Sequence, residues 1–381
     1  MWRYLTSAGL ARLADEMVLL AVVFLVQERT DSKMLAAVTA AAYTLPSILS
    51  GPLLGAWLDR TRRPLIALAG NQFVLATMTL GMVLSPAPWL PVLALVSGVT
   101  LPMTSGGFTS MLPRLGGDLA RVTAYDSMLF SASAIVGPAA AGVVAAAWSP
   151  TAAMVVIAGL AVAGGVVTLG LRLAAPRPSL HDSLLAALRA GTAHLVRMPP
   201  LRAATVTSVV SFVGFGMLPV ALPWLVQGLG SDRELAGLVF AALDLGILVS
   251  VIVLRPYLSR WRPERILFVT TGLYAVSFAA WTLAPDVVWL AALAFLAGLA
   301  SGPTLTVLIT ARQRYTPADL LGQVSTTGAS LKIGAFSLGA FAAGPLLFHG
   351  PVTVVLFVAG IQLVAVLAGL ASQPASVGSP A

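Results

Sequence analysis

Charged residues are scarce in this chain and cysteine is absent. Asp, Glu, Lys and Arg make up 9% of the 381 residues, whereas a soluble domain carries about a quarter. A surface so poor in charge cannot face water over most of its area. The absence of cysteine excludes disulfides, thiolate metal sites and a Cys nucleophile.

The sequence also lacks the motifs of enzymes and ATP-driven pumps. Its three histidines, His181, His194 and His349, have no metal-ligand spacing. It contains no Gly-rich loop followed by Lys to bind a nucleotide phosphate, and no Ser-His-Asp set can be placed together. We therefore expect neither an enzyme nor a bound metal or resident cofactor.

Long apolar runs dominate what is present, since 58% of the residues are hydrophobic. Runs of about 18 to 25 residues are long enough to cross a ~30 Å hydrocarbon core, and only a helix satisfies its backbone within one such run. The sequence predicts an all-α membrane protein with twelve transmembrane helices. The predicted spans are 5–27, 34–57, 65–84, 89–111, 122–147 and 151–172, then 202–228, 235–254, 265–284, 288–310, 320–347 and 351–372.

Three charges inside the first run argue against a cleaved signal peptide. Arg12, Asp15 and Glu16 lie where a signal requires an uninterrupted apolar core. We expect this helix to be retained and functional.

The distribution of basic residues predicts the orientation. With a cytoplasmic N-terminus, 17 of the 22 Lys and Arg residues fall on the cytoplasmic side, as the positive-inside rule requires. The net charge of +8 then reflects membrane topology and not nucleic-acid binding. We expect a multi-pass protein of the inner (plasma) membrane with both termini in the cytoplasm, in contact with the bilayer and a small-molecule substrate, and acting as a monomer.

The spans fall into two six-helix bundles joined by a polar link. The predicted units are an N-terminal bundle at 1–173, a cytoplasmic linker at 174–200 and a C-terminal bundle at 201–381. Prolines punctuate both ends of the linker, and leucines recur at helical spacing between them. This pattern predicts a short amphipathic helix on the cytoplasmic leaflet.

A weak internal repeat relates the two bundles. Gly137 and Gly142 recur 202 positions later as Gly339 and Gly344. Two halves with the same orientation are parallel repeats, and transporters built this way bind their substrate between the halves near the midplane. The sequence therefore predicts two pseudo-symmetric bundles with a site at their interface.

The strongest motif lies between the second and third predicted spans. It reads Gly51-Pro-Leu-Leu-Gly55-Ala-Trp-Leu-Asp59-Arg60-Thr-Arg62-Arg63-Pro64. This segment resembles the loop signature of the major facilitator superfamily, and the resemblance covers the whole chain. It implies the two-bundle fold of that family and a cytoplasmic gate latched by Asp59. Arg62 stands where the family has a later Gly, a variant typical of its macrolide-efflux and siderophore-exporter branch. A purely topological role for the arginines is the alternative.

A second motif, Gly137-Pro138-Ala-Ala-Ala-Gly142, resembles the antiporter motif of the same family. Proline bends a helix and small residues permit close packing, so the resemblance implies an exporter with a sealed cavity. Ordinary small-residue packing is the alternative. Many proton antiporters of the family also carry an Arg in the fourth helix, and the stretch 89–111 has none. Either Arg12 substitutes for it, or coupling is arranged differently.

Charges within the predicted spans mark the candidate site. Arg12 is three residues from Asp15 and four from Glu16, so all three can share one helix face. With Asp244 and Lys332, the spans hold one carboxylate more than they hold cations. An unpaired carboxylate away from water favours its protonated form, so it can exchange a proton for a cationic substrate.

Two interpretations of these charges remain open. In the first, Asp15 or Glu16 carries the proton and the substrate charge, with Asp244 second. In the second, Arg12 neutralises Asp15, and Lys332 neutralises Asp244, as structural pairs. Asp126, at the cytoplasmic end of the fifth span, is expected to make a gate or capping contact.

The sequence thus favours a secondary transporter that exports small amphipathic or cationic compounds against protons by alternating access. A proton-coupled symporter importing a nutrient is the alternative, followed by a non-transporting membrane scaffold or sensor.

Overall fold

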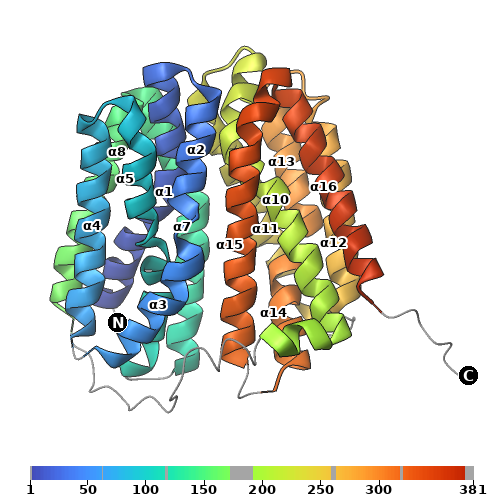
Figure 1. Ribbon diagram of the computed structural model, residues 1–381, viewed down its shortest axis with the longest axis horizontal. Coiled ribbons are helices and arrows are strands. Elements are labelled where there is room, and N and C mark those ends of the chain that lie inside the picture. The colour runs from blue at the N-terminus through green and yellow to red at the C-terminus, as the bar shows by residue number, and fades with distance from the viewer. Residues whose placement is uncertain are drawn as a thin grey trace, which may run out of the picture.

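A computed structural model describes residues 2–61, 63–115, 119–171, 192–258, 263–317 and 321–373. These residues form helices joined by short connections (Figure 1). The helices before residue 172, here called the first half, are α1 (Trp2–Thr30), α2 (Lys33–Thr44), α3 (Ser47–Arg60), α4 (Pro64–Leu84), α5 (Leu90–Gly98), α6 (Phe108–Ser110), α7 (Leu119–Ala147) and α8 (Pro150–Leu169). The second half comprises α10 (Pro199–Gly228), α11 (Ala236–Leu258), α12 (Pro263–Trp281), α13 (Val287–Ser301), α14 (Pro303–Tyr315), α15 (Leu321–Leu346) and α16 (Pro351–Ala371).

Proline and glycine divide three of the predicted spans. The predicted 34–57 span is broken at Pro46 into α2 and α3, and the 288–310 span at Gly302 into α13 and α14. The 89–111 span contains a π-helical segment, Met103–Gly107, directly after Pro102. Proline removes a backbone donor and clashes with the preceding turn, so a helix ends or widens there.

Each of the twelve predicted spans overlaps helical residues of the described chain. Within the part of the chain that the structure describes, nine helical segments are long and apolar enough to cross a membrane. The segment Val287–Ala300 is apolar but shorter. α1 is absent from the nine, and its charged residues Arg12, Asp15 and Glu16 lower its hydropathy. The total of twelve spans remains a prediction.

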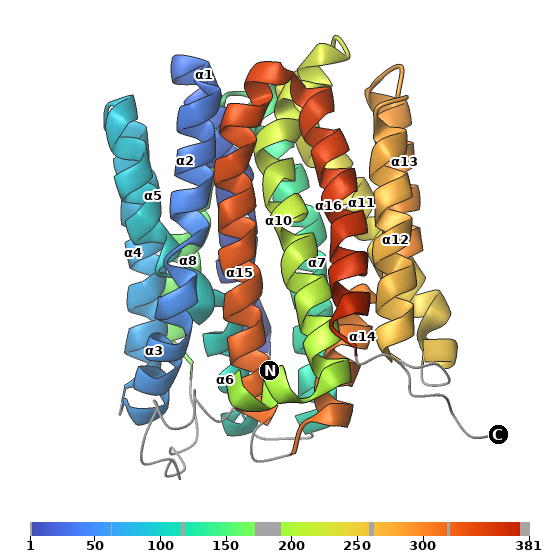
Figure 2. The ribbon, with the colours of Figure 1, turned by 45° about the vertical axis from the view of Figure 1, so that its right-hand side comes forward.

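The helices run between two ends of the molecule. The Asp31 end, at the top of Figure 1, carries the connection between α1 and α2. The opposite end, where α1 begins and α16 finishes, is called here the termini end. The first half lies on the left of Figure 1 and the second on the right, and α2 packs along α15 where they meet (Figure 2). A second contact between the halves joins α7 and α11.

The buried core differs between the two ends. At the Asp31 end one continuous cluster includes Val22 and Ala37 of the first half and Leu218 and Ala340 of the second. Toward the termini end the described residues form separate clusters, one around Tyr4 in the first half and two smaller ones in the second. The halves are therefore packed together mainly at the Asp31 end.

Polar contacts between the halves follow the same distribution. The Lys33 ammonium donates to the Leu347 carbonyl at 3.1 Å, and Arg233 forms an ion pair with Asp31 at 2.8 Å. Deeper in the molecule the Thr44 and Ser337 hydroxyls lie 2.8 Å apart. Opening this end requires these contacts between the halves to separate.

The repeated glycines occupy equivalent contacts. Gly137 of α7 packs against α1 and Gly142 against α11; Gly339 of α15 packs against α10 and Gly344 against α2. Each helix thus uses its first glycine within its own half and its second across the interface, as two parallel repeats require.

The predicted linker lies mostly outside the described residues. The structure begins again at residue 192, where a short helical stretch leads to Met198 and α10. The His194 ring nitrogen Nε2 lies 2.8 Å from the Tyr315 carbonyl oxygen, so this stretch contacts the end of α14. The predicted amphipathic helix and the domain boundaries remain predictions.

Candidate functional site

The most buried charged pair in the described chain joins α1 to α7. Arg12 Nη1 lies 2.7 Å from Asp126 Oδ1, and the two side chains are 2% and 5% exposed. Arg12 Nη2 also donates to Oδ2 at 3.1 Å. Two parallel hydrogen bonds of this kind fix both the separation and the orientation of the groups.

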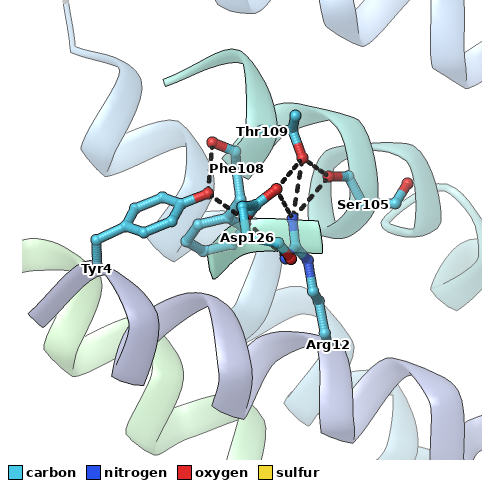
Figure 3. A network of polar contacts seen from close by, with 6 residues as sticks. All are labelled: Tyr4, Arg12, Ser105, Phe108, Thr109 and Asp126. Atoms are coloured by element: carbon cyan, nitrogen blue, oxygen red, sulfur yellow. Dashed lines mark hydrogen bonds and ion pairs between the residues drawn. The ribbon is translucent and has the colours of Figure 1, made fainter. Parts of the chain in front are cut away.

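Neighbouring polar groups complete the shell around this pair (Figure 3). The Tyr4 hydroxyl donates to Asp126 Oδ1 at 2.7 Å, and the Thr109 hydroxyl lies 2.9 Å from Oδ2. Arg12 Nη2 donates to Thr109 Oγ1 at 3.0 Å and to the Ser105 carbonyl at 3.4 Å. Because Ser105 belongs to the π-helical segment, that local widening helps to supply acceptors for the guanidinium.

This geometry corrects the expected partner of Arg12. The sequence spacing placed Arg12 on one face with Asp15 and Glu16, but the ion pair that the described residues show is with Asp126. The expected Arg12–Asp15 neutralisation is therefore wrong. Asp126 is not a helix cap; it lies inside α7, 114 residues from its partner along the chain.

Asp15 is held by a tyrosine from the next helix. It is 7% exposed, and the Tyr43 hydroxyl donates to its Oδ1 at 2.8 Å. Tyr43 itself is in close backbone contact with Gly98 of α5, where any Cβ would collide with the Tyr43 carbonyl oxygen. Gly98 thus allows α5 to support the helix that positions Asp15.

Glu16 lies against the antiporter-like segment of α7. It is half-buried, and a Cβ built on Gly137 would lie 2.5 Å from the Glu16 Cβ. On the other side of this segment, Gly142 packs against Glu234, just before α11, and against Gly237 in the first turn of α11. The segment Gly137-Pro138-Ala-Ala-Ala-Gly142 therefore lies between the α1 acids and the second half.

Asp244 brings a third carboxyl group to this region from α11. It is half-buried, and Glu16 is close enough to interact with it electrostatically. Glu16 interacts in the same way with Asp15. Among the ion pairs of the described residues none involves Asp15, Glu16 or Asp244. Glu16 thus interacts electrostatically with both Asp15 and Asp244, and in the described part of the chain no cation is bonded to any of the three, although the charge of Arg12 also acts on Glu16.

Lys332 lies elsewhere, on α15. Its ammonium nitrogen is 4.0 Å from the centroid of the Phe212 ring, and Asp244 is not its ion-pair partner in the described chain. The expected Lys332–Asp244 pair is therefore also wrong. The aromatic contact continues through Phe215, whose ring centroid lies 5.6 Å from that of Phe212.

The loop signature is described only in part. Gly51 packs against Pro102, with 3.6 Å between a built Cβ and the proline ring, and Arg63 is exposed immediately before α4. Gly55, Asp59 and Arg60 belong to α3, but their side-chain environments, like residue Arg62, lie outside the described residues. The Asp59 latch and a gate at this loop remain predictions.

Several members of the site carry no direct signal in the sequence. Tyr4, Tyr43, Ser105 and Thr109 are ordinary polar residues in apolar helices. One signal was present. Each of these residues belongs to an apolar span, and a polar side chain buried in such a span needs a hydrogen-bond partner. Which partner depends on helix rotation, which one sequence does not specify.

The fold and the buried charges define a multi-pass membrane transporter of the secondary type, not an enzyme. The sequence model of the Major Facilitator Superfamily matches residues 4–340. The chain belongs to this superfamily.

Two relatives match along most of their length. The chain is 30% identical to the uncharacterized MFS-type transporter y4rN of Sinorhizobium fredii, over 98% of this chain and 93% of that protein. It is 26% identical to the multidrug efflux pump Tap of Mycolicibacterium fortuitum, over 85% and 83% respectively.

Solved structures confirm the fold. The nucleoside transporter NupG superposes with a TM-score of 0.79 at 13% identity, covering 97% of this chain and 98% of that one. A bacterial homolog of the human lysosomal transporter Spinster, inward-facing and unoccupied, gives 0.72 at 13% identity, covering 98% of both chains. At these identities the likeness concerns the fold alone.

Proposed function

We propose that this protein exports small amphipathic or cationic compounds in exchange for protons, by alternating access of its two halves. It acts as a monomer without a bound cofactor, in the inner (plasma) membrane, with both termini in the cytoplasm. The proton gradient supplies the energy.

The observation that carries the proposal is the group of three acids between the halves. Asp15 and Asp244 each interact electrostatically with Glu16, which packs against α7. The cation nearest in sequence, Arg12, is bonded to Asp126 and acts on Glu16 only electrostatically. Carboxylates in an apolar interior need either a proton or a cation to offset their charge. A proton and a cationic substrate can therefore compete for the same groups.

This competition provides a mechanism for exchange. When the acids are open to the cytoplasm, a cationic substrate displaces the proton and neutralises the carboxylates. When they are open to the other side, where protons are more abundant, a proton displaces the substrate. Binding of each ligand thus releases the other, the proton to the cytoplasm and the substrate to the opposite side, and this exchange is antiport.

The alternating movement draws on the contacts between the halves. The Asp31 end is held by the Lys33–Leu347 and Arg233–Asp31 contacts. In the proposed orientation this end faces outward, so the structure corresponds to a state closed on the outside. Export requires these contacts to break while the α1 acids are occupied.

The comparisons support the direction of transport. The printed name of one relative is multidrug efflux pump Tap, and the small-residue segment of α7 resembles the antiporter motif. We assign the protein to the macrolide-efflux and siderophore-exporter branch on the same grounds, together with Arg62 in the loop signature.

Transport by proteoliposomes tests the proposal. A cationic dye such as ethidium should move against an imposed pH gradient in the wild type. Glu16→Gln combined with Asp15→Asn should abolish gradient-driven movement, and Asp244→Asn should weaken it. Asp286→Asn is the control, because Asp286 is an exposed acid that caps α13 and Asn also accepts the Trp289 amide. Full coupling in the double amide variant contradicts the proposal, and dye entering together with protons favours symport.

A further inference from the structure

A polar pocket lies between the halves at the Asp31 end. It has a volume of about 330 Å³. Gln27, Glu28 and Pro150 line it from the first half, and Asp232, Arg233 and Glu234 line it from the second. The acids of the proposed transport site are not among its lining residues.

The charge of this pocket is predominantly negative. Glu28, Asp232 and Glu234 contribute three carboxyl groups. The one basic residue of the lining, Arg233, is already bonded to Asp31 at 2.8 Å and lies 4.4 Å from the Trp224 ring centroid. Its charge is therefore offset outside the pocket, and the remaining acids favour a cation.

A buried amide on the pocket wall lacks hydrogen-bond partners. Gln27 is 3% exposed, and within the described chain neither its Oε1 nor its Nε2 has a partner. A buried polar group without a partner is costly and rare in folded proteins. A ligand bearing N–H donors would give Oε1 the partner that the protein does not provide.

We propose that this pocket binds a small organic cation with ammonium or guanidinium groups, entering from the Asp31 end. Its N–H groups donate to Gln27 Oε1 and to the carboxylates of Glu28 and Glu234. The pocket draws residues from both halves, so the bound cation bridges them and stabilises the state in which this end is closed. Glu234 reinforces this link, because its backbone packs against Gly142 of α7. The cation therefore acts as an inhibitor of the transport cycle.

Two probes of similar size but different charge test whether binding depends on the acids of the pocket or only on apolar contact. Putrescine carries two ammonium groups on a four-carbon chain, and 1,4-butanediol replaces them with neutral hydroxyls. Calorimetric titration of the full chain in lipid nanodiscs should show saturable binding of putrescine and no binding of the diol. Equal binding of the two probes overturns the proposal, because the acids would then contribute nothing.

Variants assign the binding to this pocket. Glu28→Gln with Glu234→Gln, and separately Gln27→Leu, should each weaken putrescine binding at least tenfold. Asp286→Asn, at the same end but outside the pocket, should leave it unchanged. Glu16→Gln with Asp244→Asn should also leave it unchanged. Loss of binding in that last variant places the probe at the transport site and overturns the proposal, whatever the variant does to transport.

Gln27→Leu also separates binding from folding. Leucine matches glutamine in size and needs no hydrogen bond, so the Tm without probe should stay the same or rise. Undiminished putrescine binding by the leucine variant contradicts the proposal. A large fall in Tm also contradicts it, because Gln27 would then already have a partner within the protein.

Discussion

Lys332 and Phe212 form a contact that repeats, with exchanged roles, in the other half of the molecule. The Lys332 ammonium nitrogen lies 4.0 Å from the Phe212 ring centroid. Phe212 is 200 positions after Arg12, and Lys332 is 202 positions after Phe130. The Arg12 guanidinium carbon lies 5.3 Å from the Phe130 ring centroid. Each half thus has a cation over an aromatic ring, but the cation is on α1 in one half and on α15 in the other.

The repeat also shows where the halves differ in charge. Asp126, which neutralises Arg12, corresponds to Gly328 in the second half at the same offset of 202. A Cβ on Gly328 would lie 2.5 Å from Arg312 Nη2. The second half therefore has a basic side chain where the first has an acid. The acids involved in the proposed exchange accordingly lie mainly on the first half, with Asp244 reaching them across the interface.

Replacing the two cations by methionine should have unequal effects on stability. Arg12→Met leaves Asp126 buried without its partner, which costs about 3–5 kcal/mol. Lys332→Met keeps the length of the side chain and its contact with Phe212 and leaves no bonded acid behind, so we expect a change within about 1 kcal/mol. Denaturation in detergent, followed by Trp fluorescence, measures both. Equal losses would show that the Lys332 charge also neutralises a buried acid.

Removing both members of the Arg12–Asp126 pair should restore much of that loss. In Arg12→Met with Asp126→Leu neither position of the pair carries a charge, and apolar replacements of buried ion pairs are often neutral or stabilising. The double variant should be more stable than Arg12→Met by about 2 kcal/mol or more. If the losses of the two single variants simply add, the pair does not act as a unit. Tyr4 and Thr109 are not substituted in any of these single or double variants.

Helix positions were predictable because they depend on local composition. Apolar runs gave the spans, and Pro46, Pro102 and Gly302 account for the breaks inside three of them. The partner of Arg12 was not predictable, because it depends on how α1 and α7 are rotated and not on spacing within α1. Asp15 and Glu16 satisfy the three- and four-residue spacing, yet the bonded acid is Asp126, 114 residues away.

The packing partners of the glycines could not be predicted from the sequence either. The repeat of Gly137 and Gly142 was visible in the sequence, but what each glycine packs against required the structure. Gly98 also has a counterpart, Gly298, 200 positions later, but only the structure shows that Gly98 supports the helix that holds Asp15. A glycine of this kind lies between two helix backbones. The sequence around the glycine does not show which other helix packs against it.

A methyl group at Gly137 should impair transport. A Cβ there meets the Glu16 Cβ at 2.5 Å and the α1 backbone at 3.1 Å, so Gly137→Ala must move α7 away from α1. We expect lower dye transport and a loss of about 1–3 kcal/mol in stability. Proteoliposome transport and chemical denaturation measure the two effects.

Gly159→Ala provides the control for this substitution. Gly159 lies within α8 and a Cβ there has nothing within 4 Å, so alanine should be neutral or stabilise by up to about 1 kcal/mol through helix propensity. Transport by this variant should match the wild type. A Gly137→Ala protein that transports normally would show that α7 tolerates displacement from Glu16.

Breaking the ion pair at the Asp31 end should shift the balance between closed and open states. Asp31 has a positive φ of 49°, a conformation that asparagine also tolerates, so Asp31→Asn removes the charge and keeps the turn. Asp31 and Arg233 are 67% and 21% exposed, and such pairs contribute about 0–1 kcal/mol. Opening of this end should therefore increase by up to about fivefold, with little change in overall stability.

The absence of native cysteine makes this change measurable without background labelling. Ser337→Cys places a thiol between α2 and α15, at a side chain that is 2% exposed in the closed state. A membrane-impermeant maleimide should label it faster when Asp31→Asn is also present, and about 1 M salt should reduce the difference because it screens the exposed pair. Asp286→Asn should not change the labelling rate. An unchanged rate with Asp31→Asn would mean that the Lys33–Leu347 contact and the apolar core suffice to keep this end closed.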